Sequence, residues 1–358
     1  MAIIPDFDWG MSGRVDGYAC QLVDPFTLVA LDTVDIDPSG TSVTWAWDTD
    51  TKSSATIAVL DDLAKDSMLR LSHTVEIGGV QFEENLGTFF ASSKSMTANY
   101  GRTSRGMDCY SALLRHQKDY LMQVHDYVPG DNVSEIIREI VEADGGHLTF
   151  APGAPVDRVH TQDMHWTVGT NKLEMITKLA GWINGEINVT DHGEVELRPA
   201  TSPLNAELAW TFEAGRNCIY TPGFTSSEDE GDVYNRAVFY YSTEEASGSY
   251  TAVLDSTHPF SYQRIGRNVT YTEEINEALG EDELKQKAVD YLTLHSGGAI
   301  YYEIEHAGIP GLRPGMTVRY VNDTDYDPPI DCLCMVSEMS VGALEPMMMT
   351  KTKMRALT

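Results

Sequence analysis

The sequence predicts an α+β fold rich in strands, with two small β-barrels, each carrying one helix, on either side of an α/β insertion. Three observations lead to this prediction. Apolar and polar residues alternate, as in half-buried strands, near the start of the chain and again from about residue 205. Between these parts the apolar period becomes helical. In the stretch 299–321, two Pro-Gly turns join two alternating strands, a pattern typical of a barrel edge.

The first β-barrel domain is expected over residues 1–124. Alternating segments run through residues 43–91, and Gly78-Gly79 between two of them predicts a two-residue hairpin turn. A helical segment over residues 108–121 is expected to close this domain.

The middle domain, residues 125–204, is predicted to be a small α/β unit. Its first helix is indicated by apolar residues at helical spacing, namely Val133, Ile136, Ile137, Ile140 and Val141. A second helix begins after Thr170. Asn184-Gly185 then turns the chain into a hairpin whose two strands are joined through Asp191-His192-Gly193.

The second β-barrel domain is expected over residues 205–358. Its acidic segment 225–232 is predicted to be a loop, and residues 281–295 are predicted to form one long helix that ends at Gly297-Gly298. The strands around the Pro-Gly turns follow this helix, and further strands reach the end of the chain.

The charge is strongly acidic: 25 basic residues stand against 54 acidic ones, a net charge of −29. A protein that binds nucleic acid through its phosphates needs a basic surface, so this composition argues against that class. The basic residues Lys351, Lys353 and Arg355 near the end of the chain are an exception.

No run of eighteen apolar residues predicts a membrane span, and the N-terminus does not resemble a secretory signal. We therefore expect synthesis in a cytoplasm and reduced thiols at all cysteines: Cys20, Cys109, Cys218, Cys332 and Cys334. Cys332 and Cys334 lie two apart in a predicted strand, a poor geometry for a disulfide.

The sequence predicts no catalytic, cofactor-binding or metal site, because it lacks the common motifs of each. One weak metal candidate combines His160 and His165 with Asp157 and Asp163, but a solvated interdomain loop is the preferred interpretation. The segment 322–327 starts like a calcium loop but lacks its glycine and its distal glutamate, so we expect an acidic turn there.

Two further features have structural interpretations. Glu83 and Glu84 are adjacent on a predicted strand, so they should point to opposite faces and cannot form a catalytic carboxylate pair. For five tryptophans, packing in a core or an interface is the preferred interpretation over a sugar-binding platform: Trp45, Trp47, Trp166, Trp182 and Trp210.

Taken in order, four pieces of the chain resemble the tail hub (baseplate hub) proteins of long-tailed bacteriophages. They are residues 45–59, residues 107–114, residues 166–176 with 184–199, and residues 233–238 followed by the helix and GIPGLRPGMTV at 308–318. Met316 departs from the family, which often has an acidic residue after the Pro-Gly, and the first forty residues match nothing in it.

The resemblance implies two tube-like barrels per subunit and a homotrimeric ring that closes the tail tube at the virion tail tip. DNA would pass through this ring without specific binding. A tail tube or distal tail protein would lie above it, and the tape measure protein and tip or fibre proteins below it. Three chains of −29 would carry −87, and carboxylates within a Debye length of about 8 Å of the channel would repel DNA.

The resemblance also implies a structural protein without cofactors, without a membrane anchor and without a peptidoglycan-cleaving domain in these 358 residues. Within such a ring we expect Lys351, Lys353 and Arg355 to dock onto acidic residues of another subunit. Two other functions are alternatives to this one. One is a receptor- or carbohydrate-binding module that uses exposed tryptophans, and the other is a cell-wall hydrolase that uses Glu83 or Glu303.

Overall fold

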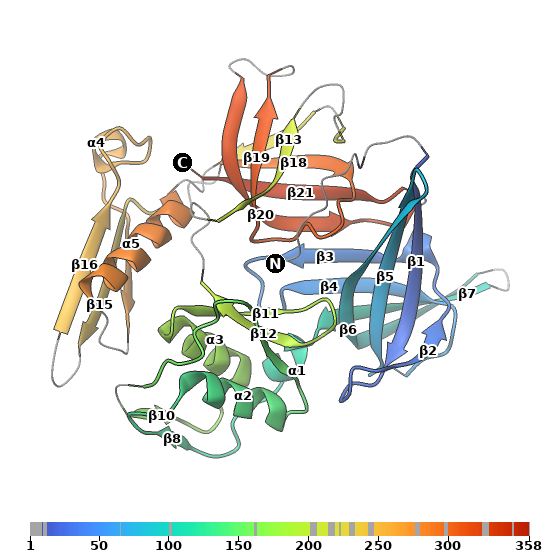
Figure 1. The fold of residues 1–358 in the computed structure, drawn as a ribbon, viewed down its shortest axis with the longest axis horizontal. Helices are drawn as coiled ribbons and strands as arrows, with labels where there is room; N and C mark the ends of the chain where they lie inside the picture. Colours follow the sequence, from blue (N-terminus) through green and yellow to red (C-terminus); the bar gives the residue numbers. More distant parts are fainter. Residues whose placement is uncertain are drawn as a thin grey trace.

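The computed structural model describes residues 9, 13–64, 66–99, 102–160, 163–200, 206–213, 219–221, 223–228, 233–242, 247–275, 280–296, 300–323, 329–345 and 347–357. Strands predominate among them and helices are few, which confirms the strand-rich class (Figure 1). No closed barrel is seen among the described strands, so the two barrels and the three domain boundaries stay predictions.

The main sheet contains thirteen of the described strands. Their hydrogen-bonded order is β14-β18-β21-β20-β3-β4-β7-β6-β5-β1-β2, and β19 pairs with both β20 and β13. The strands are β1 (Val15–Val23), β2 (Ala30–Val34), β3 (Ser42–Ala46), β4 (Ser53–Val59), β5 (Met68–Ile77), β6 (Val80–Asn99), β7 (Arg102–Ser111), β13 (Leu208–Glu213), β14 (Thr225–Glu228), β18 (Ile300–Ala307), β19 (Thr317–Asn322), β20 (Ile330–Val341) and β21 (Met349–Ala356).

The first and last parts of the chain meet within this sheet, because β3 pairs with β20 and places Val43 opposite Val341. One apolar core follows from this pairing, and it combines residues of the first part, such as Trp45 and Phe89, with Tyr320 and others of the last part. The alternating pattern predicted the strands but not their partners. Strand edges need partners, and tertiary packing decides which edge supplies them.

The helix predicted over residues 108–121 is wrong in its first half. Residues 107–111 belong to β7, which pairs with β4 and β6, and the helix α1 covers only Leu113–Gln117. In this part of β7, Met107 and Cys109 are buried whereas Asp108 is exposed. Burial at every second residue is the period of a strand. The prediction extended the apolar spacing of the following helix back over these residues.

The middle part of the chain contains both predicted helices, α2 (Val133–Ala143) and α3 (Lys172–Trp182). Each begins after an asparagine whose side chain accepts hydrogen bonds from the first turn, Asn132 and Asn171 respectively. The helices share a core with the predicted hairpin, which consists of β11 (Gly185–Val189) and β12 (Val195–Pro199). Short strands complete this middle module: β9 (Leu148–Phe150) beside β12, and β8 (His125–Tyr127) paired with β10 (Met164–Trp166).

The predicted long helix is confirmed as α5 (Glu281–Ser296), but its position differs from the expectation. It packs on a separate small sheet of β15 (Arg236–Ser242), β16 (Ser247–Val253) and β17 (Thr270–Glu274), and these elements have their own core. This α5 unit lies to one side of the main sheet in Figure 1 and also contains the short helix α4 (Tyr262–Ile265). The helix therefore does not cover the last strands of the main sheet.

The acidic segment 225–232 was predicted as a loop. Its first four residues instead form the edge strand β14, paired with β18, and residues 229–232 lie outside the described residues. A short 3-10 turn, η1 (Pro38–Gly40), completes the secondary structure. Within the described ranges, no helix has the length and apolarity that a membrane crossing requires.

Candidate functional site: a buried charge network between three parts of the chain

A chain of alternating charges runs through the interior of the main sheet. It starts at Asp16 on β1, whose carboxylate accepts two hydrogen bonds from the guanidinium of Arg14, at 2.9 and 2.8 Å. The same carboxylate lies 2.5 Å from Nε2 of His73 and accepts the backbone N–H of Met348 at 3.1 Å. The side chain of Asp16 is fully buried, so these partners replace its water.

His73 on β5 continues the chain. Its Nδ1 lies 3.1 Å from a carboxylate oxygen of Glu84 on β6, so both ring nitrogens face carboxylates. Burial disfavours the charged ring, but the hydrogen bonds to Asp16 and Glu84 outweigh it and raise the pKa of His73. With a proton on each nitrogen, the imidazolium satisfies both carboxylates.

Arg313 in the second Pro-Gly turn forms the next link. Its guanidinium donates to Glu84 at 3.1 Å and to Asp191 of the middle module at 3.1 Å, and it lies over the ring of Trp45. Burial opposes its charge, but Asp191 and Glu84 reverse that effect and raise its pKa. The backbone N–H of Gly311 donates to Glu84 at 2.9 Å, so the turn itself contributes to the network.

The network joins three parts of the chain that are distant in sequence: the first strand, the Pro-Gly turns and the hairpin of the middle module. The hairpin tip makes further polar contacts with the main sheet. The hydroxyl of Thr88 donates to the carbonyl of Asp191 at 2.9 Å, and Arg70 donates to the carbonyl of His192 at 3.1 Å. The contacts that dock this hairpin tip are thus largely polar.

Gly193 at the hairpin tip has a φ of +93°, a conformation that L residues rarely adopt. A Cβ there would lie 3.0 Å from Cβ of Thr88 and 3.1 Å from the methyl of Met68. The glycine is therefore required both for the turn and for the close approach of the hairpin to the main sheet.

A second contact centres on Trp47, at the end of β3. Arg198 of β12 and Lys52 lie over its ring, at 4.9 and 5.7 Å from the centroid. Gly315 of the second Pro-Gly turn also lies against this ring, because a Cβ there would fall 2.1 Å from it. Trp47 thus packs between the middle module and the Pro-Gly turn.

Asp16, His73 and Glu84 superficially resemble a catalytic acid–base group. Carboxylates occupy both ring nitrogens, however, and the side chains of Asp16 and His73 are completely buried. A general base needs one nitrogen free to face a reacting group. The arrangement therefore serves to hold segments together.

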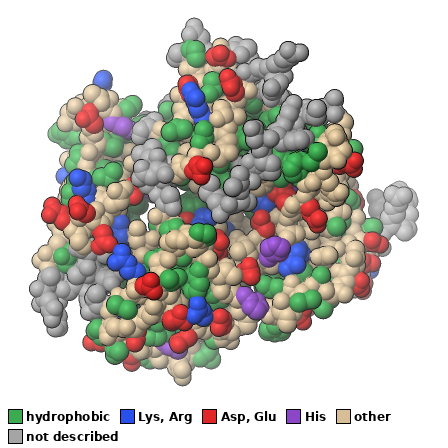
Figure 2. All heavy atoms as spheres, in the orientation of Figure 1, with side chains coloured by type: hydrophobic (Ala, Val, Ile, Leu, Met, Phe, Trp, Pro, Cys, Tyr) green, Lys and Arg blue, Asp and Glu red, His purple; other side chains and the backbone are tan. Residues whose placement is uncertain are grey.

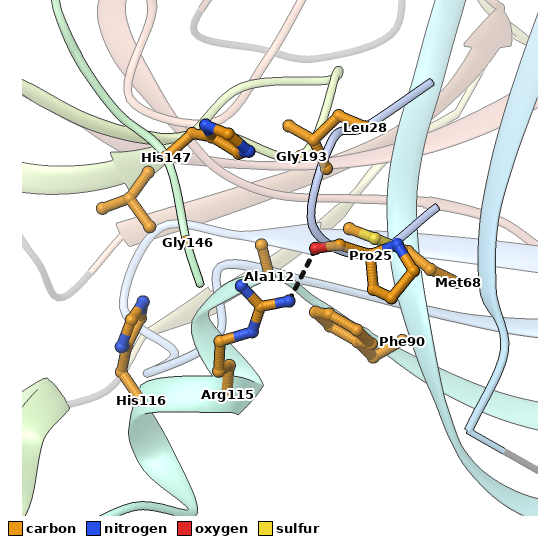
Figure 3. A pocket seen from close by; sticks show the side chains of 11 residues that line it. Pro25, Leu28, Met68, Phe90, Ala112, Arg115, His116, Gly146, His147 and Gly193 are labelled. Atoms are coloured by element: carbon orange, nitrogen blue, oxygen red, sulfur yellow. Dashed lines mark hydrogen bonds between the residues drawn. The ribbon is translucent and has the colours of Figure 1, made fainter. Parts of the chain in front are cut away.

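Figure 3 shows a small cavity between the β1–β2 loop, α1 and the middle module. Arg115 donates to the carbonyl of Pro25 at 2.7 Å, and its guanidinium lies over the ring of Phe90. The cavity measures about 10 Å³, which is room for about one water molecule. His116 lines it, and its Nε2 has no hydrogen-bond partner among the described residues. The cavity is too small for an organic ligand.

The weak metal candidate does not assemble. His160 is buried and forms a T-shaped ring contact with Trp182, and His165 pairs with Asp126 at 2.6 Å. The described residues contain no group of three or more His, Cys, Asp or Glu side chains that could hold a metal ion. Of the segment 322–327, Asn322 is buried and bonds the hydroxyl of Tyr320, and residues 324–327 lie outside the described residues.

Glu83 and Glu84 do point to opposite faces: Glu83 is exposed and Glu84 is directed into the network. Sequence reasoning missed the role of Glu84 and of His73. A signal for His73 existed, because it alternates with Leu71, Val75 and Ile77 on the buried face of β5. Asp16 and Arg14 lie in the first forty residues, for which the family resemblance offered no guidance.

Packing roles are confirmed for Trp45 and Trp166, which are buried, whereas Trp47, Trp182 and Trp210 are half-buried. Cys20, Cys109, Cys332 and Cys334 are free thiols, and Cys218 lies outside the described residues. Burial raises the pKa of the Cys20 and Cys109 thiols to about 12, so both stay protonated and inert.

No protein-family model matches the sequence, and no curated protein matches it. Solved structures do match. A tail protein from Neisseria meningitidis MC58 superposes with a TM-score of 0.66 at 12% identity, over 95% of this chain and 96% of that one. The 43 kDa tail protein of prophage MuSo2 from Shewanella oneidensis gives 0.62 at 8% identity, over 95% and 98%.

The prophage tail protein gp18 from Listeria monocytogenes EGD-e gives a TM-score of 0.57 at 12% identity, over 93% of this chain and 94% of that one. The chain has the fold of phage tail proteins. At the level of fold, this confirms the resemblance to phage tail hubs that the sequence suggested. Within the first forty residues, the described strands β1 and β2 form one edge of the main sheet.

Proposed function

We propose that this protein is a structural component of a phage tail, and that three copies form the hub at its distal tip. The hub closes the tail tube and forms part of the channel through which DNA leaves. The observation that carries the proposal is the match of the whole fold, end to end, with a tail protein of nearly the same extent. A single enzymatic or binding domain grafted onto a tail would match over part of its length only.

The main sheet would give each subunit of the proposed ring one continuous body. Its first and last strands share one core, and the buried charge network ties the middle module to that core. Acidic and basic side chains are interspersed on the face drawn in Figure 2, so no basic patch there would hold passing DNA. The large negative charge of the chain acts in the same direction.

In this proposal the ring lies in the virion tail tip, below the tail tube or a distal tail protein and above the tape measure and tip or fibre proteins. A catalytic role is not proposed. The hydrolase candidate Glu83 faces away from Glu84, and Glu303 lies opposite Lys353 on the neighbouring strand β21.

Electron microscopy of the purified protein, averaged without imposed symmetry, tests the proposal. A threefold ring around an open pore is the expected result. Particles that remain monomers, both alone and after mixing with the other tail proteins of the same phage, would contradict it.

A further inference from the structure

A cleft of about 730 Å³ lies between the middle module and the α5 unit, within the size range of ligand sites. β10 and α3 form one wall, and the end of β17 with α5 forms the other. Two contacts bridge the walls: Arg158 pairs with Glu283 at 3.3 Å, and Lys287 donates to the carbonyl of Gly181 at 3.1 Å. The two walls of the cleft are thus in direct contact beside it.

The wall on the middle module is aromatic. Trp182 at the end of α3 is half-buried, and Trp166 packs beside it with 5.8 Å between ring centroids. The ring of His160 also packs against Trp182 in a T-shaped arrangement, with 5.6 Å between ring centroids, so two neighbouring rings support the indole. The indole N–H of Trp166 is buried and has no hydrogen-bond partner in the described part of the chain. A rigid aromatic face of this kind binds flat apolar surfaces at low entropic cost.

Two carboxylates of the cleft lack an ion pair within the ranges that the structure describes. Asp163 and Glu274 are exposed, and neither carboxylate has an ion pair among the described residues. Glu273 beside them accepts a hydrogen bond from the hydroxyl of Tyr271.

The basic side chains of the cleft already have partners. Lys178 pairs with Glu174 at 2.7 Å, and His165 pairs with Asp126. Lys287 bridges the two walls. A ligand that fits must therefore bring hydrogen-bond donors and an apolar face, and it must not bring anionic groups.

A pyranose ring meets these requirements, because its C–H groups form an apolar face and its hydroxyls radiate as donors from the rim. We propose that this cleft binds an oligosaccharide of neutral or N-acetylated sugars, which stacks on Trp182 and donates hydrogen bonds to Glu274 and Asp163. A phosphate- or sulfate-bearing polymer would meet unpaired carboxylates and be repelled. The site goes beyond the hub role and would bind equally in a monomer.

The test uses the full chain on an array of neutral, N-acetylated and sulfated oligosaccharides, followed by calorimetric titration with the strongest binder. Binding of a neutral or N-acetylated oligosaccharide is expected. Trp182→Ala should weaken it about tenfold or more, and Glu274→Gln about threefold to tenfold. Glu281→Gln on the exposed start of α5, outside the cleft, is the matched control and should leave the affinity unchanged.

The Glu274→Gln variant changes one exposed side chain, so it keeps the test decisive should Trp182→Ala fold poorly. The proposal is overturned if no neutral or N-acetylated oligosaccharide binds, if sulfated ones bind best, or if Glu274→Gln binds as tightly as the parent protein. None of these outcomes bears on the threefold ring, which electron microscopy tests separately.

Discussion

Arg313 and Asp191, 122 positions apart in the sequence, form an ion pair of 3.1 Å that ties the middle module to the second Pro-Gly turn. The same guanidinium nitrogen also donates to Glu84 and to the carbonyl of Asn85. One side chain thus contacts two parts of the chain besides its own turn. The junction therefore depends on Glu84 and Arg313, whose side chains are largely buried, and on Asp191, whose side chain is 40% exposed.

Replacing Arg313 with methionine should lower the free energy of unfolding by about 1.5–3 kcal/mol, because the largely buried carboxylate of Glu84 keeps His73 and the N–H of Gly311 but loses the guanidinium. Arg319→Met is the matched control. Arg319 pairs with Asp331 at 2.7 Å on the surface, and its loss should cost no more than about 1 kcal/mol. Urea denaturation of both variants measures the difference. Equal losses would show that the buried network adds no special stability.

Because of His73, the folded state should become less stable as the pH rises above neutral. The pKa of His73 is raised in the folded state above its value of 6.5 in the unfolded chain. The stabilisation that protonated His73 provides is therefore complete below pH 6.5 and is lost as the pH rises through the folded-state pKa. The melting temperature should therefore fall above pH 6.5, and His73→Gln should flatten this decline. Thermal scans from pH 6 to 9 measure it, and parallel declines in both proteins would refute the assignment.

Gly193→Ala should destabilise the hairpin contact by about 1–3 kcal/mol, since the substitution combines positive-φ strain with crowding against Thr88 and Met68. Gly169→Ala separates the two effects. Gly169 has a φ of +86° but open space around its Cβ, so only the strain of about 1 kcal/mol applies. Denaturant titrations that rank the two variants equally would argue against close packing at residue 193.

The basic residues of β21 lie opposite acidic residues of the same chain: Lys353 faces Glu303, and Lys351 faces Glu305. Docking onto another subunit, predicted from the sequence, stays a prediction. Changing both lysines to glutamine should reduce trimer formation in native mass spectrometry, while exposed cross-strand pairs limit the loss of folding stability to about 1 kcal/mol. If the variant still forms trimers, the two lysines pair only within their own sheet and do not dock onto another subunit.

Local pattern predicted much of the secondary structure. The apolar spacing from Val133 to Val141 predicted α2, and the periodicity after residue 281 predicted α5. The run around Pro310 and Pro314 predicted strands on both sides of the turns, and β18 and β19 lie there. These features depend on residues a few positions apart, so the sequence contains the information directly.

The sequence by itself therefore determined the strand-rich class, the order of most elements and the tail-protein resemblance. Only the tertiary structure decided that β3 pairs with β20, that α5 covers its own small sheet, and that Glu84 meets His73 and Arg313. Alternation states which face of a strand is buried but not what it is buried against. A buried charge becomes stable only when distant residues supply its partners, and no local pattern records that encounter.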